Sequence, residues 1–274
     1  MNLFVGSKTF LVGEYSVLFG GSAIILVTLP EFKLQVTKGK TNLKGIDQES
    51  PAYCFYELHD FCNFSMEFVD PHKKSGGFGA SSAQFVMLYQ LCLKLTHRRF
   101  DINLFLREYQ DLSQKKNSIK PSGADCIAQY YNHHIFFNAQ TNVVEKLEWK
   151  FPQLDFIILK TKHKVVTHLH LEKLVPFDIE KLQNLTLNVK KSFLNNDEEL
   201  LIKSVQGFFD SLKKYNLVID QNIEAVDKLL RIDGIKAAKG CGAMGADTII
   251  VIFEKRKKNT LLNFLQSDDA NFFI

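Results

Sequence analysis

A glycine-rich stretch in the first half of the sequence has a composition suited to binding phosphate. Residues 75–83 read SGGFGASSA and run directly into an apolar segment with helical spacing. A helix N-terminus carries unpaired N–H groups and a partial positive charge, and glycines in front of it leave room for a bulky anion. The same residues also suit a tight turn with a serine N-cap. Taken alone, the segment fits both interpretations.

Two other phosphate-binding patterns are excluded by their context. Residues 39–41 read GKT, but Leu34 stands where the Walker loop requires its first glycine. Residues 240–245 read GCGAMG and match G-x-G-x-x-G, yet a strand pattern follows them. The dinucleotide fingerprint requires a strand before the glycines and a helix after them, so this match is a chance one.

Periodicity predicts an alternation of strands and helices around these glycines. Residues 40–53 are polar and predict a loop, and the apolar pattern of 51–64 predicts a helix that begins at a proline. A hairpin is expected at 133–139 and 143–149. Further strands are predicted at 4–12, 22–29, 33–39, 154–161 and 248–254. Further helices are predicted at 82–95, 102–114, from about Ser122, in several stretches up to 231, and at 259–266.

Composition excludes several classes of function. The 274 residues include 34 basic and 30 acidic side chains, and no basic run is long enough for a nucleic-acid-binding stripe. The five cysteines are scattered without a C-x-x-C pair, which predicts reduced thiols in a cytoplasmic protein. The longest apolar run, 22–29, is too short to cross a bilayer. We therefore expect no nucleic-acid partner and no membrane partner.

Four clusters follow one another along the chain in a recognisable order. They read GSKTFLVGEYSVLFGG at 6–21, GGFGASSA at 76–83, KPSGAD at 120–125 and KGCGAMGAD at 239–247. Together they resemble the motifs of the GHMP kinases, the family of galactokinase, homoserine kinase, mevalonate kinase and phosphomevalonate kinase. The resemblance implies an α+β fold of two domains, 1–150 (ATP-binding) and 151–274, with the active site in the cleft between them. It also implies ATP and Mg²⁺ as cofactors, a small-molecule substrate, and a monomer or homodimer.

The resemblance assigns roles to individual residues. Asp125 is expected to be the carboxylate beside the acceptor oxygen, and Lys8 to neutralise charge near the acceptor and the γ-phosphate. Without the resemblance, Asp125 fits a helix N-terminal acid and Lys8 an exposed strand lysine. The residues expected to bind the nucleotide are Gly76, Gly77, Gly79, Ala80, Ser81 and Ser82. Those expected at the substrate are Glu14, Tyr15, Thr167, Gly242, Ala243 and Gly245.

The chain departs from the family pattern at several positions. Ser81 aligns with the magnesium-binding serine of mevalonate kinase, but Gln114 stands where a second, carboxylate ligand is usual. Ser7 replaces a glycine and Ala80 replaces a serine. A catalytically impaired nucleotide- or metabolite-binding protein is therefore the alternative function. We also expect Gly79→Val to leave the fold intact, provided that the φ angle of Gly79 is negative.

The acceptor is indicated by two opposing sets of features. Tyr15 and Asp247 resemble phosphomevalonate kinases, whereas PSGAD and the modest length resemble mevalonate kinases. Phosphomevalonate is slightly favoured over mevalonate. Homoserine or a sugar is the other possibility.

Overall fold

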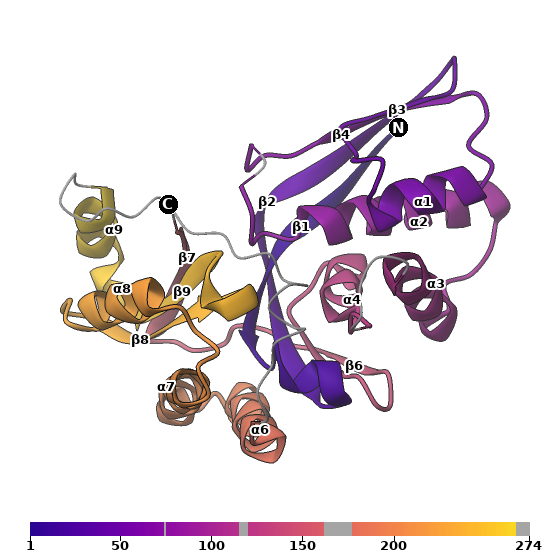
Figure 1. The fold of residues 1–274 in the computed structure, drawn as a ribbon. Coiled ribbons are helices and arrows are strands. Elements are labelled where there is room, and N and C mark those ends of the chain that lie inside the picture. Colours follow the sequence, from indigo (N-terminus) through magenta and orange to yellow (C-terminus); the bar gives the residue numbers. More distant parts are fainter. Residues whose placement is uncertain (74, 115–119, 162–176, 267–274) are drawn as a thin grey trace. The chain divides into compact units, whose positions relative to one another are not determined.

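A computed structural model describes residues 1–73, 75–114, 120–161 and 177–266 of the chain. The protein divides into two compact units (Figure 1). Unit 1 contains Met1–Thr9 and Ile25–His134, and unit 2 contains Phe10–Ile24 and Ile135–Ile274. The first two strands therefore contribute residues to both units. The domains 1–150 and 151–274 that the resemblance implies stay a prediction.

Unit 1 contains a sheet whose strands alternate between buried and more exposed residues. Within the described residues the sheet has six strands, of which four contribute to unit 1: β1 (Asn2–Val12), β2 (Ser22–Lys38), β3 (Asn42–Lys44) and β4 (Phe64–Val69). β4 lies between β3 and β2, and β1 pairs with β2. Buried Leu34 and Val36 of β2 lie opposite buried Phe68 and Met66 of β4. These cross-strand apolar pairs fix the register of the two strands.

The sheet differs from the expected strands in two ways. The strands predicted at 22–29 and 33–39 form one strand, β2, which continues through Pro30. β3 and β4 were not predicted. β3 lies inside the expected loop at 40–53, and β4 begins at Phe64, the residue at which the predicted helix was expected to end. That helix, α1, ends earlier, at Leu58. Both strands are short and are stabilised by pairing with each other, which a local pattern does not reveal.

The helices of unit 1 pack around aromatic side chains. They are α1 (Pro51–Leu58), α2 (Ala80–Thr96), α3 (Ile102–Gln114) and α4 (Ala124–Tyr131). α1 and α2 lie side by side (Figure 1). Phe85 of α2 contacts the rings of Phe55, Phe105 and Tyr109, with centroids 5.0–5.5 Å apart. This buried cluster anchors α2, whose first residue follows the glycine-rich loop.

Unit 2 contains a three-stranded antiparallel sheet in the order β7-β9-β8. Its strands are β7 (Leu154–Lys160), β8 (Ile235–Cys241) and β9 (Thr248–Glu254). The predicted hairpin is present as β5 (Ile135–Asn138) and β6 (Val143–Lys146). β8 was not predicted as a strand, because its residues Ala237, Ala238 and Gly240 have weak strand preferences.

Two helices of unit 2, α6 and α7, start at aspartate caps. Asp178 accepts a hydrogen bond from Lys181 N at the start of α6, and Asp197 accepts one from Leu200 N at the start of α7. α7 and α8 both pack against β8 (Figure 1). The α-helices are α6 (Ile179–Asn195), α7 (Glu198–Lys214), α8 (Asp220–Leu230) and α9 (Lys258–Gln266). The 3₁₀ helices are η1 (Ser16–Phe19), η2 (Ala243–Gly245) and η3 (Lys255–Lys257).

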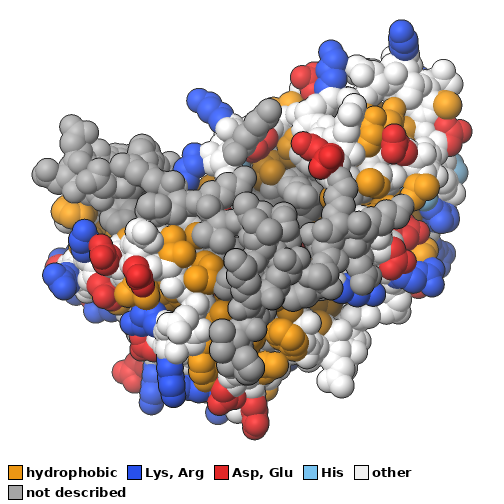
Figure 2. All heavy atoms as spheres, in the orientation of Figure 1, with side chains coloured by type: hydrophobic (Ala, Val, Ile, Leu, Met, Phe, Trp, Pro, Cys, Tyr) orange, Lys and Arg blue, Asp and Glu red, His pale blue; other side chains and the backbone are white. Residues whose placement is uncertain are grey.

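The surface carries charges of both signs. Basic and acidic side chains are interspersed over the described part of the face in Figure 2, in keeping with the near balance of 34 basic and 30 acidic residues. Within the described ranges, no helix has the length and apolar character needed to span a membrane.

Candidate active site

Lys8 and Asp125 form an ion pair in unit 1. The Lys8 Nζ lies 3.8 Å from Asp125 Oδ2, and the two side chains are 14% and 25% exposed. β1 presents the lysine, and the first turn of α4 presents the aspartate. Asp125 Oδ1 also accepts a hydrogen bond from Cys126 N (3.0 Å). The helix N-terminus and the ammonium both stabilise the carboxylate, and partial exposure leaves it accessible to a ligand.

The start of α4 depends on the PSGAD sequence. Gly123 is the N-cap with φ +73°, a conformation that favours glycine, and a Cβ there would lie 2.5 Å from Leu106 Cδ2. Ser122 Oγ accepts a hydrogen bond from Ala124 N (3.3 Å). The motif therefore aims Asp125 by fixing the turn from which its helix begins.

Two uncharged side chains, Cys126 and Tyr109, neighbour Asp125. Cys126 and Tyr109 are buried. Burial raises the pKa of the Cys126 thiol and of the Tyr109 hydroxyl well above their ordinary values, and the neighbouring Asp125 carboxylate adds to both shifts. Both groups therefore keep their protons at neutral pH.

The glycine-rich loop ends at the N-terminus of α2. Gly79 is the N-cap with φ +87°, and no side chain caps the helix. The amides of the first turn are therefore available to an anion. Ser82 is buried and its hydroxyl donates to Gly79 O (3.0 Å), whereas Ser81 is exposed. Ser82 thus stabilises the loop, and Ser81 offers its hydroxyl to solvent.

The loop and Lys8 hold each other in place. Lys8 N donates to Phe78 O (2.9 Å), and a Cβ at Gly79 would lie 2.6 Å from Lys8 Cγ. The buried Gln129 amide donates to both Gly79 O (3.1 Å) and Gly6 O (2.9 Å). Sequence reasoning missed Gln129. The sequence does contain a clue to it. Gln129 follows Asp125 by four residues, and this i, i+4 spacing places both side chains on one face of α4.

The predicted metal ligands are only partly described. Ser81 is exposed in the first turn of α2. Gln114 is the last residue of α3, and its side chain lies outside the described structure. Among residues 1–73, 75–114, 120–161 and 177–266, no group of three or more His, Cys, Asp or Glu side chains could hold a metal ion. The magnesium ligands stay a prediction.

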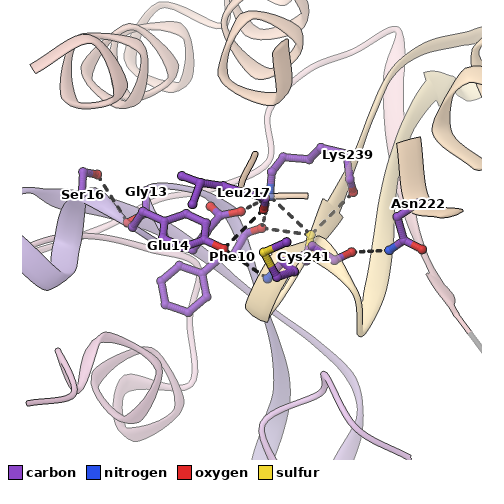
Figure 3. A network of polar contacts seen from close by, with 11 residues as sticks. Phe10, Gly13, Glu14, Ser16, Leu217, Asn222, Lys239 and Cys241 are labelled. Carbon is purple, nitrogen blue, oxygen red and sulfur yellow. Dashed lines mark hydrogen bonds and ion pairs between the residues drawn. The ribbon is translucent and has the colours of Figure 1, made fainter. Parts of the chain in front are cut away.

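Unit 2 contains a second network, built on a buried ion pair (Figure 3). Lys239 Nζ lies 2.7 Å from Glu14 Oε1, with the two side chains 0% and 7% exposed. The ammonium also lies 3.6 Å from Cys241 Sγ and 3.5 Å from Phe10 O. Burial opposes a charged lysine, but Cys241 and Glu14 outweigh it and raise the pKa of Lys239. The pair joins the first of the four clusters, at 6–21, to the fourth, at 239–247.

Tyr15 makes a second connection between the same two motifs. Its hydroxyl donates to Leu217 O (3.3 Å) and accepts from Met244 N (3.1 Å). Burial raises the pKa of Tyr15 well above its ordinary value. Gly245 O accepts a hydrogen bond from Asn222 Nδ2, so α8 also anchors this turn (Figure 3). Tyr15 is therefore a buried linker as well as a predicted substrate residue.

The remaining predicted substrate residues fall into two groups. Gly242 (φ +88°) and Gly245 (φ +62°) form the turn between β8 and β9, and a Cβ at Gly242 would collide with the Asp247 carboxylate. Thr167 and the Ala243 side chain lie outside the described structure. Substrate binding by Glu14, Tyr15, Thr167, Gly242, Ala243 and Gly245 stays a prediction.

The expectation that Gly79→Val leaves the fold intact required a negative φ angle at Gly79, and this condition is not met. Since φ is +87°, any side chain is strained, and a Cβ also meets Lys8. We predict that Gly79→Ala lowers the free energy of unfolding by about 1–3 kcal/mol, measured by chemical denaturation. Gly20→Ala is the matched control, because Gly20 has φ +82° but its nearest neighbour is Gln140 Cβ at 3.9 Å. Equal losses in the two variants would contradict the Lys8 contact.

The Glu14–Lys239 pair generates a further prediction about stability. Glu14→Gln and Lys239→Met each leave one buried group without its charged partner, so each should lower the free energy of unfolding by about 3–5 kcal/mol. The double variant should lose much less than the sum of the two, as a double-mutant cycle would measure. Lys150→Met, which removes an exposed ion pair with Glu148, is the control with a far smaller effect. Additive losses would contradict a direct interaction.

The sequence and the structure were compared with those of known proteins. No protein-family model matches the chain, and no curated protein is significantly similar to it. Phosphomevalonate kinase of Streptococcus pneumoniae, in complex with phosphomevalonate and AMPPNP, matches with a TM-score of 0.77 at 15% identity, covering 100% of this chain and 98% of that one. Mevalonate kinase of Methanococcus jannaschii gives 0.76 at 17%, covering 100% and 96%. Galactokinase of Lactococcus lactis, complexed with galactose, gives 0.73 at 11%, covering 94% and 87%. The predicted α+β class is thereby confirmed, and this chain has the fold of the GHMP kinases.

Proposed function

We propose that this protein is an ATP-dependent kinase that phosphorylates a small molecule. The observation that carries the proposal is the Lys8–Asp125 pair, held against a glycine-rich loop at the uncapped N-terminus of α2. Phosphoryl transfer depends on positioning and on neutralising charge, and this arrangement offers both. The bound phosphomevalonate and AMPPNP of the S. pneumoniae phosphomevalonate kinase support the same reaction class.

The loop and α2 would bind the nucleotide phosphates. Gly76, Gly77 and Gly79 leave the backbone accessible, and the first-turn amides of Ala80, Ser81 and Ser82 point at the position of an anion. Lys8 adds a positive charge beside the loop, since its backbone is bonded to Phe78. The nucleotide therefore meets donors and a cation that are already in position.

Asp125 would act on the acceptor. Its carboxylate can take the proton of a hydroxyl acceptor or orient an acceptor oxygen towards the γ-phosphate. Lys8, 3.8 Å away, would neutralise the charge that accumulates between acceptor and phosphate. Because Cys126 and Tyr109 stay protonated, they do not compete for this proton.

Magnesium fits the exposed hydroxyl of Ser81 at the first turn of α2. When bound, Mg²⁺ would neutralise part of the negative charge of the phosphates. Ser81 and Gln114 are the residues proposed to hold it. An amide oxygen coordinates the cation but brings no charge, so most of the attraction would come from the nucleotide itself.

The acceptor proposed first is phosphomevalonate, with mevalonate second. Tyr15 and Asp247 support the first, as in the sequence resemblance. Glu14 Oε2 is buried and accepts no hydrogen bond from any described residue, so it can accept one from a ligand hydroxyl. The sequence departures at Ala80 and Gln114 favour, as a second candidate, a protein that binds nucleotide without turnover.

The function is tested by measuring ADP release with mevalonate, phosphomevalonate, homoserine and galactose. We predict turnover with one of the first two acceptors. Asp125→Asn should lower kcat by about 10²-fold or more and retain ATP binding, because the amide cannot accept the proton. Asp111→Asn, an exposed aspartate of α3, is the matched control with unchanged kcat.

Each outcome of this assay separates the candidates. Thermal stabilisation by ATP, with no ADP release in the presence of any of the four acceptors, would favour the protein that binds nucleotide without turnover. Neither stabilisation nor release would contradict both candidates. A fully active Asp125→Asn variant would place the chemistry at another residue.

Gln114 generates a prediction about magnesium dependence. A carboxylate attracts the cation directly, so Gln114→Glu should lower the Mg²⁺ concentration for half-maximal activity several-fold at fixed ATP. Gln90→Glu places the same charge on α2 and should leave that concentration unchanged. Equal midpoints for wild type and Gln114→Glu would show that residue 114 does not face the metal.

A further inference from the structure

Ser7, which replaces a glycine of the family pattern, is buried and makes two short polar contacts. Its Oγ lies 2.6 Å from Pro30 O and 2.6 Å from His72 Nε2, and the side chain is 0% exposed. Ser7 directly precedes Lys8, and His72 lies shortly before the glycine-rich loop. The hydroxyl therefore connects the strand that presents the lysine to the segment that leads into the loop.

The two contacts of Ser7 define the direction of both hydrogen bonds. A carbonyl oxygen only accepts, so the single hydroxyl proton of Ser7 is donated to Pro30 O. The hydroxyl oxygen must then accept the bond from His72, which places a proton on His72 Nε2. The imidazole is thus held in one orientation from one edge of its ring.

The face of the same imidazole lies against the loop. The His72 and Phe78 rings are stacked, with centroids 3.9 Å apart and planes at 3°. Phe32 lies 5.5 Å away. Phe78 is the loop residue whose carbonyl accepts the Lys8 N–H at 2.9 Å. Ser7, the residue before Lys8, therefore contacts His72, His72 stacks on Phe78, and Phe78 accepts a hydrogen bond from Lys8.

We propose that Ser7 and His72 are positioning residues of the glycine-rich loop, acting through the ring of Phe78. The proposal rests on the proposed nucleotide-binding function of that loop. Three glycines between residues 76 and 79 give the free loop many conformations, and a loop ordered in advance loses less entropy when phosphate binds. The family pattern has glycine at position 7, which offers no hydroxyl to His72. Serine supplies the anchor for this ring.

The test separates the hydrogen bond from the stacked ring. His72→Phe keeps an aromatic ring but loses the donor, His72→Gln keeps a donor but loses the ring, and His72→Ala loses both. Backbone amide exchange is measured for peptides that contain Lys8 and residues 75–83 in the ligand-free protein, and KM for ATP and kcat are measured alongside. His97→Asn is the control, because His97 is exposed with φ +54°, a conformation that asparagine tolerates.

We expect His72→Ala to speed amide exchange at these peptides and to raise KM for ATP, each by about tenfold, with kcat at saturating ATP nearly unchanged. His72→Phe and His72→Gln should fall between wild type and His72→Ala, and Ser7→Ala should match His72→Phe. A merely space-filling role would instead make His72→Phe equal to wild type, and that result overturns the proposal. Unchanged exchange in His72→Ala overturns it as well. If wild type neither binds nor uses ATP, the proposed function fails, while the exchange data still decide whether His72 orders the loop.

Discussion

Lys8 is held at both of its ends, and the unit 1 site depends on this. Its backbone N–H is bonded to the Phe78 carbonyl of the loop, and its ammonium faces the Asp125 carboxylate. The strand, the glycine-rich loop and α4 are therefore fixed relative to one lysine. Gly79 has to be glycine because the lysine side chain passes directly over it. The Gln129 side-chain amide adds to this arrangement by donating to the Gly6 carbonyl of the strand and to the Gly79 carbonyl of the loop.

The network in unit 2 is built on a buried ion pair, whereas the Lys8–Asp125 pair of unit 1 is partly exposed. Lys239 and Glu14 are almost completely removed from solvent, where the cost of desolvating two charges is offset only by close contact. The pair and the Tyr15 hydroxyl both connect the cluster at 6–21 to the cluster at 239–247. Motif residues in this unit thus stabilise the turn between β8 and β9.

The sequence predicted those parts of the fold that depend on local patterns. The bounds of α3 agreed with its apolar periodicity, and α2 and the β5–β6 hairpin lay close to their expected ranges. The ordered motifs predicted the GHMP kinase fold, and several of their glycines, among them Gly13, Gly79 and Gly123, have the positive φ that favours glycine. β8 was missed because its residues have weak strand preferences, whereas β3 and β4 were missed because their stability comes from pairing with strands that lie elsewhere in the chain. The roles of Gln129 and His72 were missed because their partners Gly6 and Ser7 lie far away in sequence.

The division of β1 and β2 between two units has a consequence for synthesis on the ribosome. Domains tend to fold as units while the chain emerges from its N-terminus. Unit 1 is complete in sequence once His134 has been made, although Phe10–Ile24 is excluded from it. That segment contains Glu14 and Ser22, whose partners Lys239 and Gln183 are made much later. The segment, which includes the buried Leu11 and Val12, therefore completes its contacts only after the last strands of the chain have been made.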